Sequence, residues 1–293
     1  MQTRAFLDTP HSRGQVLART MRSTNELATI ARKLRVDILK MIHAAGSGHP
    51  GGSLSTVELI STLYFKELRY TVGNPSDPAR DRFILSKGHG VPTAYAALAY
   101  AGCIPEDELG SFRQINSRLQ GHPDHVRLPY MEAATGSLGQ GLSVALGMAL
   151  AVPLTDEQFR VYCLLGDGEL QAGQVWEAAM AAGKFGTSGL TAIVDYNKVQ
   201  LDGHTKDVMD LAPLGAKFEA FGWHVLEIDG HDFDAIIGAL DSARAETGRP
   251  TVIIAHTVKG KGVSFMEDTH AWHGKAPNDE ELKRAIAEIE AAA

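Results

Sequence analysis

The sequence predicts an α/β fold in which a mostly parallel sheet is flanked by helices. Short apolar runs alternate with helical segments of about ten to fifteen residues along most of the chain. Strands separated by helices of that length are joined by right-handed crossovers, which make neighbouring strands parallel. Because 44% of the 293 residues are hydrophobic, the chain can also bury a large core.

Composition limits the classes of partner and compartment. The chain has 28 Lys and Arg against 35 Asp and Glu, a net charge of −7, and no long basic run. This argues against nucleic acid or an anionic membrane as a partner. The two cysteines, Cys103 and Cys163, lack CxxC partners, and no apolar stretch is long enough to span a membrane. Since the first twenty residues also lack the apolar core of a signal peptide, we expect a cytoplasmic protein.

The elements follow from the start of the chain. Residues 1–20 are expected to be a loose leader, and residues 21–293 a single α/β domain that ends in a helix. Apolar residues at spacings of three and four from Leu27 to Ile42 predict the first helix. A second helix is expected from Ser55 to about Leu68. The Gly- and Pro-containing segment Tyr70–Arg80 indicates a loop.

Strands and helices then alternate to the end of the chain. The expected strands are Arg82–Leu85, Val161–Leu165, Leu190–Val194, His224–Ile228 and Thr251–Ala255. The expected helices are Val91–Ala101, Gly139–Ala151, about Val175–Lys184, Phe233–Glu246 and Asp279–Ala293.

Polar residues follow two successive strands. Asp167 comes directly after one strand and Asn197 after the next, 197 − 167 = 30 residues later, which is about one βαβ unit. Both side chains are therefore expected at the carboxyl edge of the sheet, where open α/β folds bind ligands. Their oxygens suit Mg²⁺ or Ca²⁺ with phosphate oxygens completing the shell. Gly166 and Gly168 would let the backbone approach a diphosphate at the following helix N-terminus.

A Gly-Asp-Gly tripeptide on its own is also common in turns. The asparagine at the matching place, one βαβ unit later, favours the metal and diphosphate interpretation.

Four histidines are flanked by glycine in segments expected to be loops or element ends. Imidazoles there can donate hydrogen bonds to a sugar's hydroxyl or carbonyl groups, or move protons near neutral pH. The alternative for each, His122 above all, is an ordinary surface loop histidine. The segments are Ser47–Gly51 with His49, Ser86–His89 with His89, Gly121–Pro123 with His122, and Trp272–Lys275 with His273.

These motifs together resemble a known family. Gly-Asp-Gly followed by Asn about thirty residues later resembles the signature of the thiamine diphosphate enzymes. The four histidine segments in this order, with Ser111–Gln114 and Ala134–Gly141, look like transketolase from about residue 25 to residue 280.

The resemblance implies a role for each matching residue. Asp167, Asn197 and the Val199 carbonyl would hold the metal, Mg²⁺, with Ca²⁺ or Mn²⁺ as alternatives. Lys87 would lie near the diphosphate or the substrate. The implied catalytic groups around the reacting carbon and the donor ketose are His49, His89, His122 and His273. The implied cofactor-binding residues are His89, Gly136, Ser137, Leu138, Gly166, Asp167, Gly168, Glu169, Asn197, His273 and Lys275.

The implied activity is transfer of a two-carbon ketol unit from a ketose phosphate to an aldose phosphate, by default in the pentose phosphate pathway. A full transketolase has a further domain that carries the glutamate activating the cofactor. The chain therefore resembles the N-terminal subunit of a split enzyme, acting with a C-terminal subunit in an α₂β₂ heterotetramer. Ala172 stands where many transketolases have an acidic residue in a chain of carboxylates that links paired sites, whereas Glu177 matches a second member.

Three alternatives remain at this stage. The chain could be the α subunit of a 2-oxo acid dehydrogenase, or of the related synthase that joins pyruvate to a triose phosphate. The sugar-facing histidines argue against the dehydrogenase, because it passes an acyl unit to a lipoyl arm. The third alternative is a non-catalytic assembly subunit, against which the joint presence of Asp167, Asn197 and His273 argues.

Overall fold

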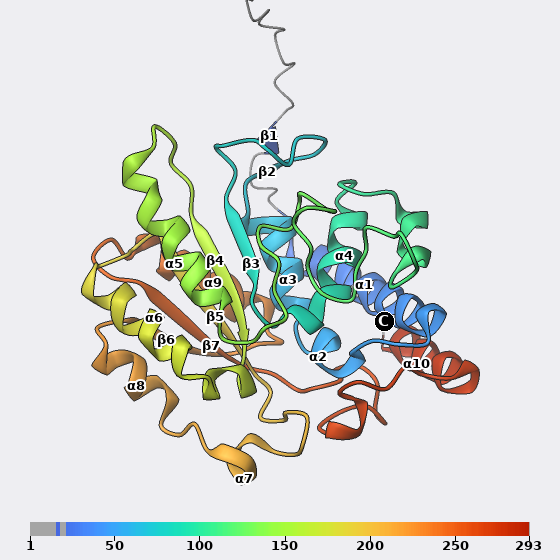
Figure 1. Cartoon of the computed structure of the whole chain (residues 1–293). Helices are drawn as coiled ribbons and strands as arrows, with labels where there is room; N and C mark the ends of the chain where they lie inside the picture. The colour runs from blue at the N-terminus through green and yellow to red at the C-terminus, as the bar shows by residue number, and fades with distance from the viewer. Residues whose placement is uncertain (1–15, 18–21, 293) are drawn as a thin grey trace, which may run out of the picture.

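A five-stranded parallel sheet forms the centre of the molecule (Figure 1). The computed structural model describes residues 16–17 and 22–292. The strands lie in the order β3-β4-β5-β7-β6, and every neighbouring pair is parallel. Their bounds are β3 Arg82–Leu85, β4 Val161–Gly166, β5 Leu190–Tyr196, β6 His224–Asp229 and β7 Thr251–His256. The predicted fold class and all five predicted strands are confirmed, with ends extended by up to two residues.

Helices cover both faces of the sheet. In Figure 1, α5, α6 and α8 lie on one side, and α1, α3 and α4 lie on the other. The helices are α1 Thr24–Ala45, α2 Pro50–Leu54, α3 Val57–Thr62, α4 Val91–Tyr100, α5 Gly141–Ala151, α6 Gly173–Lys184, α7 Thr205–Met209, α8 Leu214–Ala220, α9 Phe233–Ala245 and α10 Asp279–Ala291. Short 3₁₀ turns are Gly88–Gly90, Glu106–Ser111, Val152–Leu154, Gly168–Gln171 and His270–Trp272.

Two apolar cores follow from this layering. Along β4, Tyr162 and Leu164 belong to the core beneath α1, α3, α4 and α9, whereas Cys163 and Leu165 belong to the core beneath α5, α6 and α8. Side chains alternate across a strand, so a sheet covered on both faces needs apolar residues at every position. This is why the strands read as continuous apolar runs in the sequence.

Several predicted boundaries are corrected. The helix predicted from Ser55 to Leu68 consists of α3 and a wider π turn, Leu63–Glu67, closed by the Leu68 amide on the Leu63 carbonyl. Pro50, expected in a loop, is the first residue of α2, a position that needs no amide hydrogen. The short helices α7 and α8 were not predicted.

The ends of the predicted domain are described only in part. Tyr70–Thr71, placed in a loop, forms strand β2 and pairs antiparallel with β1, Val16–Leu17, inside the predicted leader. Residues 1–15, 18–21 and 293 lie outside the described residues, so the division into a leader (1–20) and a domain (21–293) stays a prediction. None of the helices in the described ranges is long and apolar enough to cross a membrane.

Glycine at position 183 is required by the packing of α6 against the chain that follows α8. A β-carbon added at Gly183 would overlap the backbone carbonyl oxygen of Phe221, whereas one added at Gly147 in α5 would meet no atom within 4 Å. We expect Gly183→Ala to lower the free energy of unfolding by ~1–3 kcal/mol through overpacking. Gly147→Ala should leave it unchanged or raise it by up to ~1 kcal/mol through helix propensity. Urea unfolding of both variants tests this, and equal stabilities would contradict it.

Candidate functional site

The carboxyl ends of β4, β5 and β7 meet at one edge of the sheet, beside a cavity of about 250 Å³. Thirteen of the residues named from the sequence line this cavity: His49, Lys87, His89, His122, Gly136, Leu138, Gly166, Asp167, Gly168, Glu169, Asn197, Val199 and His273. Three further residues complete the lining: Gln200, Leu201 and Lys259. The crossover topology therefore brings together segments that are far apart in the chain.

The three proposed metal-binding residues lie at this edge. Gly166 pairs with Asp195 in the sheet, which places Asp167 beside the end of β5. The Asp167 carboxylate accepts hydrogen bonds from the Gly168 amide at 2.7 Å and from the Lys198 amide. Asn197 Oδ1 accepts from the Val199 amide at 3.1 Å, and Val199 also lines the cavity.

The donor set fits a cation that shares its shell with a phosphate. Burial, followed by repulsion from Asp195, raises the pKa of Asp167 to about 7, so the carboxylate gains from a nearby positive charge. Across residues 22–292, no group of three or more His, Cys, Asp or Glu side chains is arranged to hold a metal ion by itself. One carboxylate, one amide oxygen and one carbonyl leave several positions of a Mg²⁺ shell to a ligand and to water.

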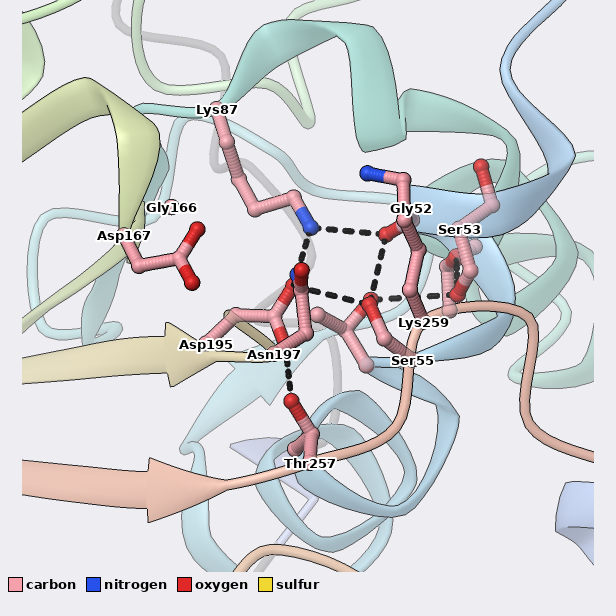
Figure 2. A network of polar contacts seen from close by, with 12 residues as sticks. Gly52, Ser53, Ser55, Lys87, Gly166, Asp167, Asp195, Asn197, Thr257 and Lys259 are labelled. Carbon is pink, nitrogen blue, oxygen red and sulfur yellow. Dashed lines mark hydrogen bonds and ion pairs between the residues drawn. The ribbon is translucent and has the colours of Figure 1, made fainter. Parts of the chain in front are cut away.

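Asp195 ties the elements of the site together, although no role for it was predicted from the sequence. It is fully buried and accepts hydrogen bonds from Ser55 Oγ at 2.7 Å, from Asn197 Nδ2 at 2.8 Å and from Thr257 Oγ1 (Figure 2). The Lys87 ammonium forms an ion pair with the same carboxylate. Burial disfavours the charge of Asp195, yet Lys87 and these hydrogen bonds hold its pKa below the ordinary value.

Two buried lysines supply the positive charge of the site. Lys87 Nζ also donates to the Gly52 carbonyl at 2.7 Å, and Lys259 Nζ donates to the Val199 carbonyl at 3.1 Å. Burial, with repulsion from Lys87, lowers the pKa of Lys259 to about 8. Lys259 was missed as a site residue, although it follows the end of β7 by three residues, much as Asp167 and Asn197 follow β4 and β5.

Glu169 holds backbone in place rather than facing the cavity with free oxygens. Its carboxylate accepts from the Gly139 amide at 2.9 Å, from the Gly166 amide at 3.0 Å and from the Ser86 hydroxyl. Burial raises its pKa, although these hydrogen bonds oppose the rise. Glu169 thereby joins the loops that follow β3 and β4 to the segment before α5.

The four glycine-flanked histidines form one cluster. The ring of His49 lies 5.3 Å from that of His89, 6.3 Å from that of His122 and 5.5 Å from that of His273, measured between centroids. Burial lowers the pKa of all four, to about 4 for His49 and to about 3 for His273. The imidazoles are therefore neutral at pH 7, and each offers one donor and one acceptor nitrogen.

Two of these imidazole rings each have a buried nitrogen without a hydrogen-bond partner. Within the described ranges, Nδ1 of His49 and Nδ1 of His273 are buried and make no hydrogen bond. Buried polar atoms are rarely left unpaired, so this arrangement favours a polar ligand between the rings.

Two proposed cofactor-binding residues lie outside the lining. Ser137 is exposed and lies between the lining residues Gly136 and Leu138. Lys275 is turned toward the surface, where its ammonium pairs with Glu281 at 2.6 Å and lies 4.1 Å from the ring centre of Trp272. Glu281 belongs to the first turn of α10, so the C-terminal helix holds Lys275 away from the cavity.

Comparison with known proteins identifies relatives along nearly the whole chain. Residues 23–289 match the family model described as transketolase, thiamine diphosphate binding domain. The chain is 45% identical to a 6-deoxy-6-sulfo-D-fructose transketolase subunit of Clostridium sp. (strain MSTE9), over 90% of this chain and 94% of the relative. It is 41% identical to an apulose-4-phosphate transketolase subunit of Actinobacillus succinogenes, over 91% of this chain and 97% of the relative.

A solved structure shows the same fold in a longer chain. The transketolase of Campylobacter jejuni superposes with a TM-score of 0.85 at 34% identity, covering 92% of this chain but 43% of that one. The chain thus spans less than half of the solved transketolase and nearly all of the two bacterial subunits.

The neutral histidines make stability depend on pH. As the pH falls through about 6.5, the unfolded chain binds protons on these imidazoles, whereas folded His49 and His273 stay neutral down to about pH 4 and pH 3. Their contribution to the free energy of unfolding is therefore full above pH 6.5 and is lost as the pH falls toward 4. Between pH 7 and pH 5, the wild type should lose more stability in urea unfolding than the variant His49→Gln/His273→Gln. Parallel losses in the two proteins would contradict the buried, neutral state.

Proposed function

Because this chain belongs to the transketolase family, we propose that it is the diphosphate-binding subunit of a split transketolase. With a separate C-terminal subunit, it would transfer a two-carbon ketol unit from a ketose phosphate to an aldose phosphate. The observation that carries the proposal is the cluster of four neutral histidines beside the edge formed by Asp167 and Asn197. An acyl-transferring enzyme with a lipoyl arm would have no need for this sugar-facing set.

Thiamine diphosphate and a divalent metal fit the residues of this edge. Asp167, Asn197 and the Val199 carbonyl would hold Mg²⁺, for which Ca²⁺ or Mn²⁺ could substitute. The ammonium of Lys259, which lines the same cavity, would compensate part of the diphosphate charge. When bound, thiamine diphosphate supplies the nucleophilic carbon that takes up and releases the two-carbon unit.

The chain's own groups orient the sugar and move its protons. A neutral imidazole can take a proton from a substrate hydroxyl and return it later, with a donor nitrogen still available for a carbonyl oxygen. His49 and His273 suit this role because their buried Nδ1 atoms need a partner.

The relatives suggest which sugars to test. One is named for 6-deoxy-6-sulfo-D-fructose and the other for apulose 4-phosphate, so both names specify a sugar that carries an anionic group. We propose a ketose phosphate donor, as in the pentose phosphate pathway, with a sulfonated ketose as the second candidate because of the 45% identity. These are soluble metabolites, so the proposed location is the cytoplasm.

Exposed apolar side chains, two of them in the cavity, support a partner subunit. Leu138 and Leu201 line the cavity and are 43% and 60% exposed, and elsewhere on the described surface Met209 on α7 and Met180 on α6 are 61% and 55% exposed. Obligate interfaces are large and apolar, and they would cover such residues. We propose that the C-terminal subunit covers them in an α₂β₂ assembly.

Asp167→Ala is expected to remove thiamine diphosphate and Mg²⁺ binding and to leave the fold intact. The lost charge-assisted contact is worth roughly 1.5–3 kcal/mol, so the affinity should fall by at least ~10-fold. Calorimetric titration of the assembled enzyme measures the change. Asp202→Ala, which removes an exposed carboxylate from the nearby loop, is the matched control and should bind normally. Unchanged cofactor affinity in Asp167→Ala would exclude this residue from the site.

The isolated chain is expected to be inactive in ketol transfer and to become active when a partner is added. The described residues supply the histidines and the edge of the sheet proposed to bind the diphosphate, with Asp167 and Asn197, which we call the diphosphate edge. The activating carboxylate is expected on the other subunit. Transfer from a ketose phosphate to an aldose phosphate should be assayed with this chain alone and then with the product of an adjacent gene. Full activity of the chain alone, with no increase on mixing, would overturn the split-enzyme proposal.

A further inference from the structure

The segment that follows β7, residues 257–262, carries two side chains into the site. Thr257 Oγ1 donates to Asp195 (Figure 2), and Lys259 Nζ donates to the Val199 carbonyl at 3.1 Å. The position of the Lys259 ammonium therefore depends on where the backbone of residues 257–262 is held.

Groups outside the site hold this backbone. The Val258 amide donates to Nε2 of His231 at 2.8 Å, and the Gly260 amide donates to the Gly51 carbonyl at 2.9 Å. In addition, Arg35 Nε donates to the Lys261 carbonyl at 3.0 Å. The backbone of residues 258 and 261 thus forms hydrogen bonds with groups outside the site, and the side chains of residues 257 and 259 form hydrogen bonds with groups in the site.

His231, Glu58 and Arg35 form a buried cluster behind the segment, and none of the three lines the cavity. Glu58 on α3 accepts from Arg35 Nη2 of α1 at 2.6 Å and contacts Nδ1 of His231 at 3.0 Å. Arg35 and Glu58 are each 7% exposed. Burial opposes the charge of Glu58, but Arg35 and His231 hold its pKa below the ordinary value, so it remains an acceptor for both.

The hydrogen bonds fix the tautomer of His231. The Val258 amide is a donor, so Nε2 must be the unprotonated nitrogen. The proton is then on Nδ1 and is donated to Glu58. A carboxylate behind a histidine commonly sets its tautomer and orientation in this way.

We propose that His231 is a positioning residue, which acts through the Val258 amide to hold the Lys259 ammonium at the diphosphate edge. Glu58, itself held by Arg35, selects the tautomer that makes this contact. The inference rests on the proposed function, because the ligand that Lys259 would meet is the diphosphate of thiamine diphosphate. Arg35 on α1 and Glu58 on α3 thereby help to set the position of the Lys259 ammonium, although neither residue lines the cavity.

His231→Phe keeps a ring and removes both hydrogen bonds. In the assembled enzyme with Mg²⁺, calorimetric titration should show thiamine diphosphate affinity reduced by ~10- to 100-fold, the range typical of groups that support a ligand. His231→Gln retains one donor and one acceptor and should recover most of the affinity. His256→Phe is the matched control: it removes an exposed histidine–glutamate pair at 3.0 Å, with Glu227, and His256 does not line the cavity. Its affinity should stay within ~2-fold of wild type.

A double-mutant cycle separates positioning from general stability. If His231 acts through Lys259, His231→Phe should weaken binding much less in a Lys259→Met background than in the wild type, because the ammonium is already absent. Equal effects in the two backgrounds, or unchanged affinity of His231→Phe, would overturn the inference and leave the proposed function standing. Wild-type enzyme that binds no thiamine diphosphate would overturn both. If His231→Phe does not fold, the same cycle is measured with His231→Gln. The expected loss of thiamine diphosphate affinity is then smaller, and it should again be present in the wild-type background and absent in the Lys259→Met background.

Discussion

The ion pair between Asp195 and Lys87 is the interaction on which the site depends. Both side chains are almost fully buried, so each charge is tolerable only because the other is present. Asp195 also accepts from groups on the α2 segment and on the chain after β7, namely Ser55 and Thr257. Four segments that are distant in the sequence therefore share one carboxylate. Removing either charge would leave the other buried without a partner, which constrains every loop at this edge.

The distribution of charge around this pair explains what the cavity can bind. The positive charges of Lys87 and Lys259 are buried and fixed, whereas the four histidines are neutral. Burial and repulsion from Asp195 raise the pKa of Asp167 in spite of the charge on Lys259, so a further cation beside Asp167 would be favourable. This distribution fits the proposed metal and anion at the edge formed by Asp167 and Asn197, and proposed uncharged hydroxyl and carbonyl groups beside the histidines. The two proposed ligands differ in the same way, because the diphosphate of thiamine diphosphate is charged and the reacting end of the sugar is not.

The sequence predicted what depends on local pattern and missed what depends on contacts through space. The five strands follow from apolar runs, and the positions of Asp167 and Asn197 follow from the crossover length. In the structure, these two residues lie at the same edge of the sheet. The helices α7 and α8 are only five and seven residues long, so packing rather than periodicity decides them. Lys275 resembled a site residue, but its partner Glu281 lies in the C-terminal helix. No role was predicted for Asp195, because that role becomes clear only when Lys87 and Thr257 are seen beside it. An aspartate inside an otherwise apolar strand was the available signal.

The loops at the proposed diphosphate site are held by groups of this chain, whereas the surface that would cover the sugar is expected to come from a second subunit. Asp195, Glu169 and His231 hold their loops through bonds made entirely within the described residues. The cavity, by contrast, has exposed apolar residues such as Leu201, which a second subunit would cover. The two bacterial relatives match this chain along nearly its whole length at 45% and 41% identity, yet they are named for different sugars. We infer that this half of the site fixes the cofactor and the reacting carbon. Discrimination between sugars at the end away from the reacting carbon would then fall mainly to the surface that covers the cavity, because the other subunit supplies that surface.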